Sequence, residues 1–225
     1  MKKILFTLLI VLSILGIFTT AGQAILVPSL SFLELNRVDH NLDPTRDLII
    51  GYEFRTNQPI IVAQLGVYDH FLNGLAENHL VGIFDSTSHN LLASTNVATS
   101  NPLLNRFRYN SLNTPLFLPA NHTYRIAALA GHVDEFGADP RNLFINPAIT
   151  YIDGSVDFIS PAAGQLDFPN FSLTDLGLSY VGVFGPNFRF EALPNSPSAP
   201  VVPEPVTLTL LGSGLAGFWV RRKKS

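Results

Sequence analysis

The chain has 225 residues, contains no cysteine and carries a formal net charge of −3 at pH 7. All four lysines lie at the two ends, so residues 25–203 keep eight arginines against sixteen acidic residues, a formal charge of −8. This acidic balance argues against nucleic acid and anionic membrane surfaces as partners, because both require clustered positive charge. Without disulfides, the middle of the chain needs a hydrophobic core large enough to hold it together.

The first 24 residues have the composition of a secretory signal peptide. Lys2 and Lys3 precede an apolar run from Ile4 to Phe18, and small residues then lead to Ala24. The apolar run is shorter than the ~20 residues that span a bilayer comfortably. We therefore predict cleavage after Ala24, and a permanent N-terminal membrane helix is the alternative.

Short apolar runs separated by turn residues fill the chain from Leu48 to Phe190, which is typical of strands. The predicted strands are Ile49–Phe54, Ile60–Tyr68, His79–Phe84, Leu91–Val97, Tyr124–Leu129, Ala148–Ile152, and Tyr180–Phe184 with Phe188–Phe190. No stretch shows helical apolar spacing over three turns. The sequence therefore predicts an all-β domain over residues 25–193, built as a single antiparallel β-sandwich or jelly roll.

The loop from Asp69 to His79 is the most polar segment beside a predicted strand. Its Asp69, Asn73 and Glu77 offer hard oxygen ligands of the kind that Ca²⁺ accepts. The alternative is turn chemistry, in which Asp and Asn bond local backbone amides and Gly74 takes a positive φ. No zinc-ligand spacing surrounds His79, so we expect it to have a hydrogen-bonded structural role at the start of its strand.

Residues 131–142 are predicted to form a longer loop, whose Asp134, Glu135 and Asp139 either bind a second Ca²⁺ or are simply solvated. Residues 185–187 are predicted to form a turn. The middle of the chain has no Gly-x-Ser-x-Gly motif and no phosphate-binding glycine loop, so no catalytic residue is assigned. Tyrosines that could stack on a sugar ring are Tyr52, Tyr68, Tyr109, Tyr151 and Tyr180.

The C-terminus has three parts in a fixed order after a Pro/Ser-rich linker at residues 194–202. Pro203, Glu204 and Pro205 come first, an apolar segment follows from Val206 to Val220, and Arg221, Arg222, Lys223 and Lys224 come last. A helix over the apolar segment would extend about 22 Å, which is short for a hydrocarbon core of ~30 Å. Basic residues stay on the cytoplasmic side, so the tail is predicted to stop transfer with the domain outside. An ordinary tail anchor is the alternative.

This tail, residues 203–225, resembles the PEP-CTERM sorting signal of Gram-negative bacteria. The resemblance implies processing by an exosortase, a membrane transpeptidase, with Pro203, Glu204 and Pro205 as its recognition residues. It also implies transient anchoring in the inner membrane through the C-terminal helix, followed by display at the cell surface or release. Association with exopolysaccharide and biofilm is part of the same implication.

A second resemblance covers Leu48 to Leu129. The runs Leu65–Asp69, Asn73–His79, Val81–Asp85 and Leu91–Ser94 are similar to a domain of unknown function found in bacterial surface proteins, which is taken to be a β-sandwich. We therefore expect a non-catalytic structural or interaction module with no cofactor other than a candidate Ca²⁺. A carbohydrate-binding module, with or without structural Ca²⁺, is the first alternative, and a hydrolase is a distant third.

Overall fold

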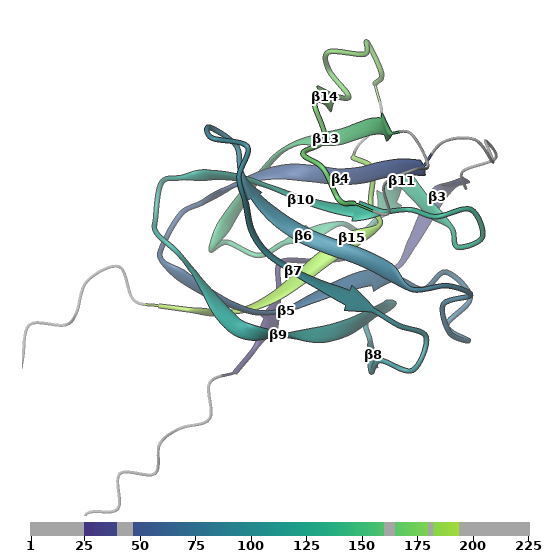
Figure 1. The fold of residues 1–225 in the computed structure, drawn as a ribbon, viewed down its shortest axis with the longest axis horizontal. Coiled ribbons are helices and arrows are strands. Elements are labelled where there is room, and N and C mark those ends of the chain that lie inside the picture. Colours follow the sequence, from purple (N-terminus) through teal and green to yellow (C-terminus); the bar gives the residue numbers. More distant parts are fainter. Residues whose placement is uncertain (1–24, 40–46, 160–164, 180–181, 194–225) are drawn as a thin grey trace, which may run out of the picture.

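The apolar runs of the sequence pair into antiparallel sheets, and the described part of the chain contains no α-helix (Figure 1). This computed structural model describes residues 25–39, 47–159, 165–179 and 182–193. No helix in these ranges is long and apolar enough to cross a membrane. The predicted signal peptide, linker and sorting tail, with their expected helices, lie outside the described residues.

The strands are β1 (Val27–Pro28), β2 (Leu30–Ser31), β3 (Glu34–Asp39), β4 (Asp47–Thr56), β5 (Ile60–Tyr68), β6 (His79–Asp85), β7 (Leu91–Val97), β8 (Leu103–Leu104), β9 (Phe107–Leu118), β10 (Thr123–Leu129), β11 (Phe136–Arg141), β12 (Phe144–Ile145), β13 (Ile149–Ile159), β14 (Phe171–Ser172) and β15 (Pro186–Ala192). One sheet has the order β1-β15-β5-β9-β8, and the other has the order β14-β13-β4-β10-β6-β7. Two short ribbons, β3 with β11 and β2 with β12, complete the structure. Figure 1 shows the two large sheets stacked as layers, which gives a β-sandwich-like arrangement.

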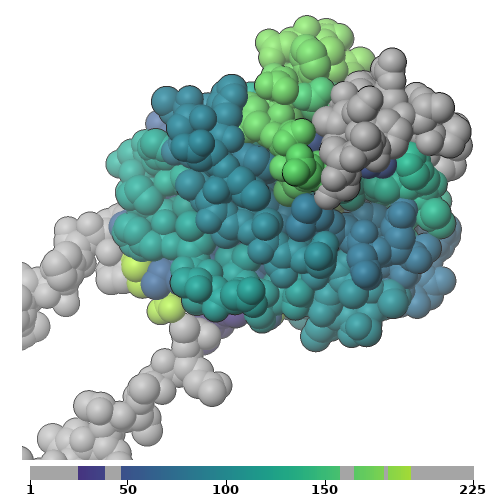
Figure 2. Space-filling view, in the orientation of Figure 1, coloured from purple at the N-terminus to yellow at the C-terminus, as the bar shows by residue number. Residues whose placement is uncertain are grey.

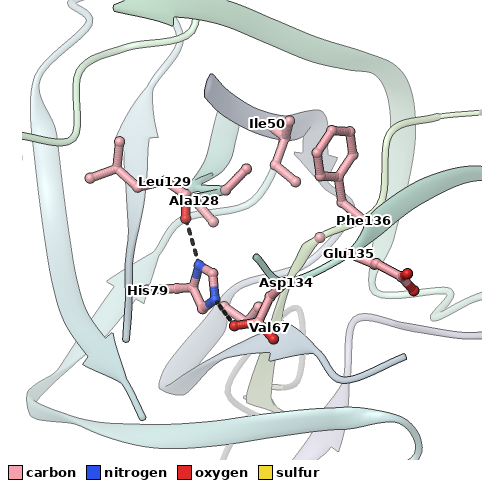
Figure 3. Close-up of a pocket in the computed structure, with 10 residues that line it drawn as sticks. Ile50, Val67, His79, Ala128, Leu129, Asp134, Glu135 and Phe136 are labelled. Atoms are coloured by element: carbon pink, nitrogen blue, oxygen red, sulfur yellow. Dashed lines mark hydrogen bonds and ion pairs between the residues drawn. The ribbon is translucent and has the colours of Figure 1, made fainter. Parts of the chain in front are cut away.

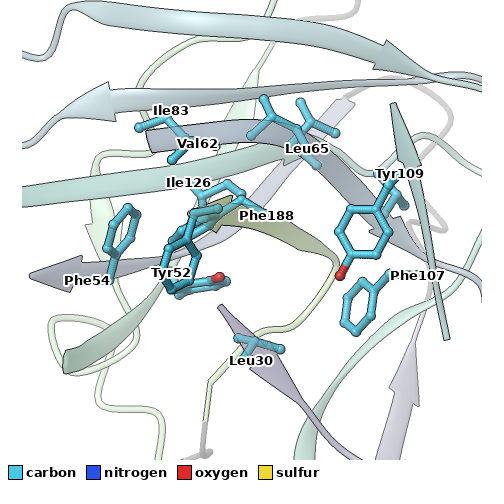
Figure 4. Packing of buried hydrophobic residues seen from close by; sticks show 14 of the residues in the cluster. Leu30, Tyr52, Phe54, Val62, Leu65, Ile83, Phe107, Tyr109, Ile126 and Phe188 are labelled. Carbon is cyan, nitrogen blue, oxygen red and sulfur yellow. The ribbon is translucent and has the colours of Figure 1, made fainter. Parts of the chain in front are cut away.

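One hydrophobic core lies between these two sheets. Tyr52 and Phe54 of β4 meet Leu65 of β5 and Phe188 of β15 within a single cluster of buried side chains (Figure 4). Alternate residues of each strand point to opposite faces, so Glu53, which lies between the two aromatic residues of β4, points outward. This core gives the cysteine-free chain the apolar burial that its stability requires.

The six-stranded sheet is also covered on its outer face. Ile49, Phe84, Ala127 and Leu166 form a second buried cluster there. Figure 2 shows the segment at residues 165–179 (green) lying on this side of the molecule. Because both faces are covered, β4 is buried continuously from Leu48 to Tyr52, without the alternation of a half-exposed strand.

Several sequence predictions are corrected by the structure. Within the range predicted as strand at 180–184, the described residues 182–184 form no strand, and Phe184 makes only an isolated bridge to Gly137. Pro186 and Asn187 begin β15 and do not form the predicted turn. Proline is tolerated at the first residue of a strand, where no ladder hydrogen bond is lost.

The loop predicted at residues 131–142 contains a strand, β11, which pairs with β3. The twelve-residue β9 was not predicted at all, although it lies between β5 and β8 in the five-stranded sheet. The predictions at β5 and β7 agree with the structure residue for residue.

The two ends of the described domain lie at the same end of the sandwich. The Leu193 amide donates to the carbonyl of Pro59 at 2.9 Å, and Val27 pairs with Phe190. From Ile60, which pairs with Ala192, β5 runs about 26 Å to Tyr68, at 3.3 Å per residue. The loops that follow Tyr68 therefore lie at the opposite end, which we call the distal end (Figure 1).

Candidate functional site

Ionisable side chains gather at the distal end, where the β5–β6 loop (residues 69–78) meets the β10–β11 loop (residues 130–135). The second loop starts 61 residues after the first, and the pairing of β10 with β6 brings them together. Ion pairs at this end join Asp69 with Arg108, His70 with Glu135, His79 with Asp134, and His132 with Asp47. The distal end is therefore the richest concentration of polar chemistry in the described chain.

His79, the first residue of β6, lies at the centre of this cluster with only 2 % of its surface exposed. Its Nδ1 lies 2.8 Å from the Leu129 carbonyl oxygen, and its Nε2 lies 2.9 Å from Asp134 Oδ2 (Figure 3). Both partners offer acceptor oxygens, so the protonated ring can donate from both of its nitrogens. Burial opposes this charge, but the hydrogen bonds to Asp134 and Leu129 outweigh burial and raise the pKa of His79.

The Asp134 carboxylate links the two loops. Its Oδ1 accepts from the Ala76 amide at 2.9 Å, and its Oδ2 accepts from the Glu77 amide at 3.0 Å. Burial alone would raise the pKa of Asp134, but the hydrogen bonds from His79 and from the two amides lower it. Asp134 is therefore a fixed anion at neutral pH.

Glu77 makes the reciprocal contact from the other loop. Its Oε1 accepts from the amides of His132 and Val133 at 2.8 and 3.1 Å. The approach requires a glycine at position 131, because a Cβ on Gly131 would lie 2.1 Å from Glu77 Oε1. Gly131 also has φ of +65°, which side chains with a Cβ rarely adopt. The sequence therefore builds a close contact between a carboxylate and the backbone here.

The candidate Ca²⁺ ligands predicted from the sequence are divided between different roles. Asp69 is 2 % exposed, and its Oδ2 accepts from Arg108 Nε at 2.8 Å and from the Gly74 amide at 3.0 Å. Asp69 and Asn73 line an open hollow of about 320 Å³ at the distal end, which Asp134 also lines. Glu77 is bonded to the other loop. The turn chemistry that was the alternative for Asp69 and Gly74 is thus present, and Ca²⁺ binding by these residues stays a prediction.

A different set of side chains has the geometry of a metal site. Among the described residues, Glu77, His79 and Asp134 bring three potential ligand atoms within 4.8 Å of one another. Sequence reasoning named Glu77 and Asp134 as candidate Ca²⁺ ligands in two separate loops and gave His79 a structural role. It did not foresee that Asp134 meets His79, which is 55 residues away. The signal that could have found the pair is the placement of both residues at strand ends that a sandwich brings together.

The other acids of the predicted loop at 131–142 do not join this group. Glu135 pairs with His70 at 3.3 Å, and Asp139 belongs to β11. A small cavity beside His79 and Asp134, drawn in Figure 3, has a volume of about 10 Å³ and an otherwise largely apolar lining. This volume is enough for one water molecule at most.

The tyrosines proposed for sugar stacking belong to the core. Tyr52, Tyr68 and Tyr109 are each at most 3 % exposed, and Tyr151 packs against the same core. Tyr180 lies outside the described residues. A sugar ring needs an exposed aromatic face, so Tyr52, Tyr68 and Tyr109 cannot provide a stacking surface. Phe71 is the aromatic residue that is exposed beside the hollow, at 67 %.

Comparison with known proteins bears on the end of the chain and not on the sandwich. No curated protein matches the chain. The residues predicted for sorting, Pro203, Glu204 and Pro205, and the basic residues from Arg221 to Lys224 lie outside the described structure. These residues fall within residues 201–224, which match the family model of the PEP-CTERM protein-sorting motif. The match implies an exported protein that is anchored transiently in the membrane and has an exosortase as its sorting partner.

Proposed function

We propose that this chain is a non-catalytic structural or interaction module, delivered by an exosortase to the cell surface or the extracellular matrix, where it associates with exopolysaccharide. The observation that carries the proposal is the PEP-CTERM motif at residues 201–224. The motif accounts for how the chain travels, and the sandwich is the part that is delivered.

The position of the domain ends supports display of the distal loops. The described domain ends at Leu193, beside Pro59, and the sorting motif begins only eight residues later, at Val201. While the motif holds the chain at the membrane, the end with Pro59 is therefore tethered nearest to it. The hollow, the exposed Phe71 and the ion-paired loops lie at the other end, about 26 Å further out at 3.3 Å per residue along β5.

A carbohydrate-binding module is the second candidate, and one observation favours it. The distal hollow combines the exposed ring of Phe71 with the polar side chains of Asn73 and Thr99, as a site for sugar hydroxyls and C–H groups would. Because the tyrosines are buried, Phe71 is the aromatic residue whose role in sugar binding should be tested. A glycan-array screen of the unmodified chain and of Phe71→Ala, with and without Ca²⁺, distinguishes this candidate. Glycan binding that Phe71→Ala abolishes supports it, and an absence of binding to any glycan contradicts it.

The sorting proposal is tested by replacing Glu204 with Ala in a host that has the exosortase. We expect the Glu204→Ala chain to remain in the membrane fraction, while the unmodified chain leaves it. Ser198→Ala, in the preceding linker, is the matched control and should be sorted normally. Release of Glu204→Ala at the unmodified rate would show that the motif is not what sorts this chain.

A further inference from the structure

We propose that Glu77, His79 and Asp134 bind one divalent transition-metal ion such as Zn²⁺. Their ligand atoms all lie within 4.8 Å of one another, and the His79 Nε2 to Asp134 Oδ2 distance is 2.9 Å. Ligands at ~2.1 Å from a tetrahedral ion lie about 3.4 Å apart. Small side-chain shifts are therefore enough to seat the ion, which would take the place of the Nε2 proton of His79.

The orientation of each ligand is already fixed by a second contact. His79 Nδ1 donates to the Leu129 carbonyl, which turns Nε2 toward the two carboxylates. Metal-bound histidines usually donate their other ring N–H to a carbonyl or carboxylate in this way. The carboxylates of Glu77 and Asp134 are each held by two backbone amides, so no ligand needs to be ordered when the ion binds.

Charge balance favours a divalent ion. With His79 neutral, Glu77 and Asp134 together contribute a charge of −2. The hydrogen bonds that Glu77 accepts within the described part of the chain come from the backbone amides of His132 and Val133, and not from an arginine or lysine. In contrast, Asp69 is neutralised by Arg108, which repels a cation from the alternative position. A positive ion at Glu77, His79 and Asp134 would therefore complete the local charge.

The ligand types select the class of metal. Ca²⁺ needs six to eight oxygen ligands, whereas this group offers one imidazole nitrogen and two carboxylates. Zinc sites with three protein ligands keep a fourth position for water or for a ligand. The Asp134 side chain is 14 % exposed and also lines the open hollow of about 320 Å³, which provides a path for entry.

The test is calorimetric titration of the full chain, purified in detergent, with Zn²⁺. We expect one bound ion per chain. Glu77→Gln should weaken binding by at least about tenfold, because the amide oxygen keeps both backbone hydrogen bonds but loses the charge. Asp85→Asn is the matched control: it alters the His122–Asp85 pair, whose Nε2 to Oδ2 distance is 2.6 Å, and should leave Zn²⁺ binding unchanged.

A measurement on the unmodified chain keeps the proposal testable if Glu77→Gln does not fold. Nitrogen NMR of the His79 ring should show a change at Nε2 on addition of Zn²⁺, with Nδ1 still protonated. The proposal is overturned if Zn²⁺ does not saturate at one site, if Glu77→Gln binds as tightly as the unmodified chain, or if the His79 ring is unaffected. Binding of Ca²⁺ alone, lost in Asn73→Ala, would also overturn it in favour of the oxygen-ligand site.

Discussion

Asp69 Oδ2 lies 2.8 Å from Arg108 Nε, and the two side chains are only 1 % and 13 % exposed. This pair ties the end of β5 to β9, and Arg108 also donates to the Asn101 carbonyl at 2.9 Å. A buried ion pair that loses one partner leaves the other charge uncompensated, which is the costly outcome. The pair is therefore more sensitive to a single substitution than any exposed pair of the domain.

The first prediction is that Asp69→Asn lowers the free energy of unfolding by about 3 kcal/mol. The asparagine oxygen can still accept from the Gly74 amide, so the loss reports the stranded Arg108 charge. Glu34→Gln is the control, because Glu34 and Arg141 are 48 % and 61 % exposed and such pairs contribute little, under ~1 kcal/mol. Urea denaturation measures both, and equal losses would contradict the prediction.

Gly131→Ala should destabilise the domain by more than a positive φ alone explains. Two glycines have nearly the same φ, +65° at Gly131 and +66° at Gly177, but only Gly131 lies against another group, the Glu77 carboxylate. Gly177→Ala should cost about 1 kcal/mol from backbone strain. Gly131→Ala should cost at least about 1 kcal/mol more, because Glu77 must also leave its amide partners.

Thermal or urea unfolding of the two alanine variants gives the comparison. If the two substitutions lower the free energy of unfolding equally, the contact between Glu77 and the backbone of the β10–β11 loop does not contribute to stability. Glu77→Gln should not share this loss, since the glutamine oxygen can still accept from the amides of His132 and Val133.

The sequence correctly predicted strands in which apolar and polar residues alternate or in which apolar residues are continuous. β5 at Ile60–Tyr68 and β7 at Leu91–Val97 were found to the residue. β9 was missed because a bulge interrupts it: Val62 pairs with Leu116 and Gln64 with Ser111, so the residues between Ser111 and Leu116 are displaced from the ladder. A bulge shifts the phase of alternation, and with Pro115 inside it the segment does not read as one strand.

An apolar run in the sequence predicts that its residues are buried more reliably than it predicts that their backbone forms a strand. Val183 and Phe184 are buried as their composition suggests, but their backbone is not part of a strand beyond the bridge at Phe184. The sequence indicated only part of the candidate site, and the reason is a different one. Glu77 and His79 stand close in sequence, whereas Asp134 reaches them through the pairing of β10 with β6, which local sequence does not encode.

A further prediction concerns a buried asparagine that the sequence suggested was part of a turn. Asn187 is fully buried. Its side-chain oxygen accepts from the Phe188 amide at 2.8 Å and from the Ser29 hydroxyl. Its Nδ2 donates to the Leu30 carbonyl at 3.0 Å. Asn187→Ala should cost about 2 kcal/mol, because it leaves buried polar groups without partners. Asn57→Ala, which breaks exposed hydrogen bonds to the Pro147 carbonyl and from the Thr150 hydroxyl, should cost under ~1 kcal/mol, because water replaces both partners. Similar losses in the two variants would contradict this account of Asn187.

The last prediction is a pH dependence carried by Asp85. Hydrogen bonding from the Ser88 amide, then from His122 and the Thr87 amide, lowers the pKa of Asp85 from its ordinary value of 3.8 to about 2. A carboxyl group whose folded pKa is lowered stabilises the fold above its unfolded pKa, and this contribution is lost as the pH falls through the folded value. The stability difference between the unmodified chain and Asp85→Asn should therefore shrink as the pH falls from about 4 to about 2. Carbon NMR of the Asp85 carboxyl gives its pKa directly, and a midpoint near 3.8 would show that these hydrogen bonds do not favour the ionised form.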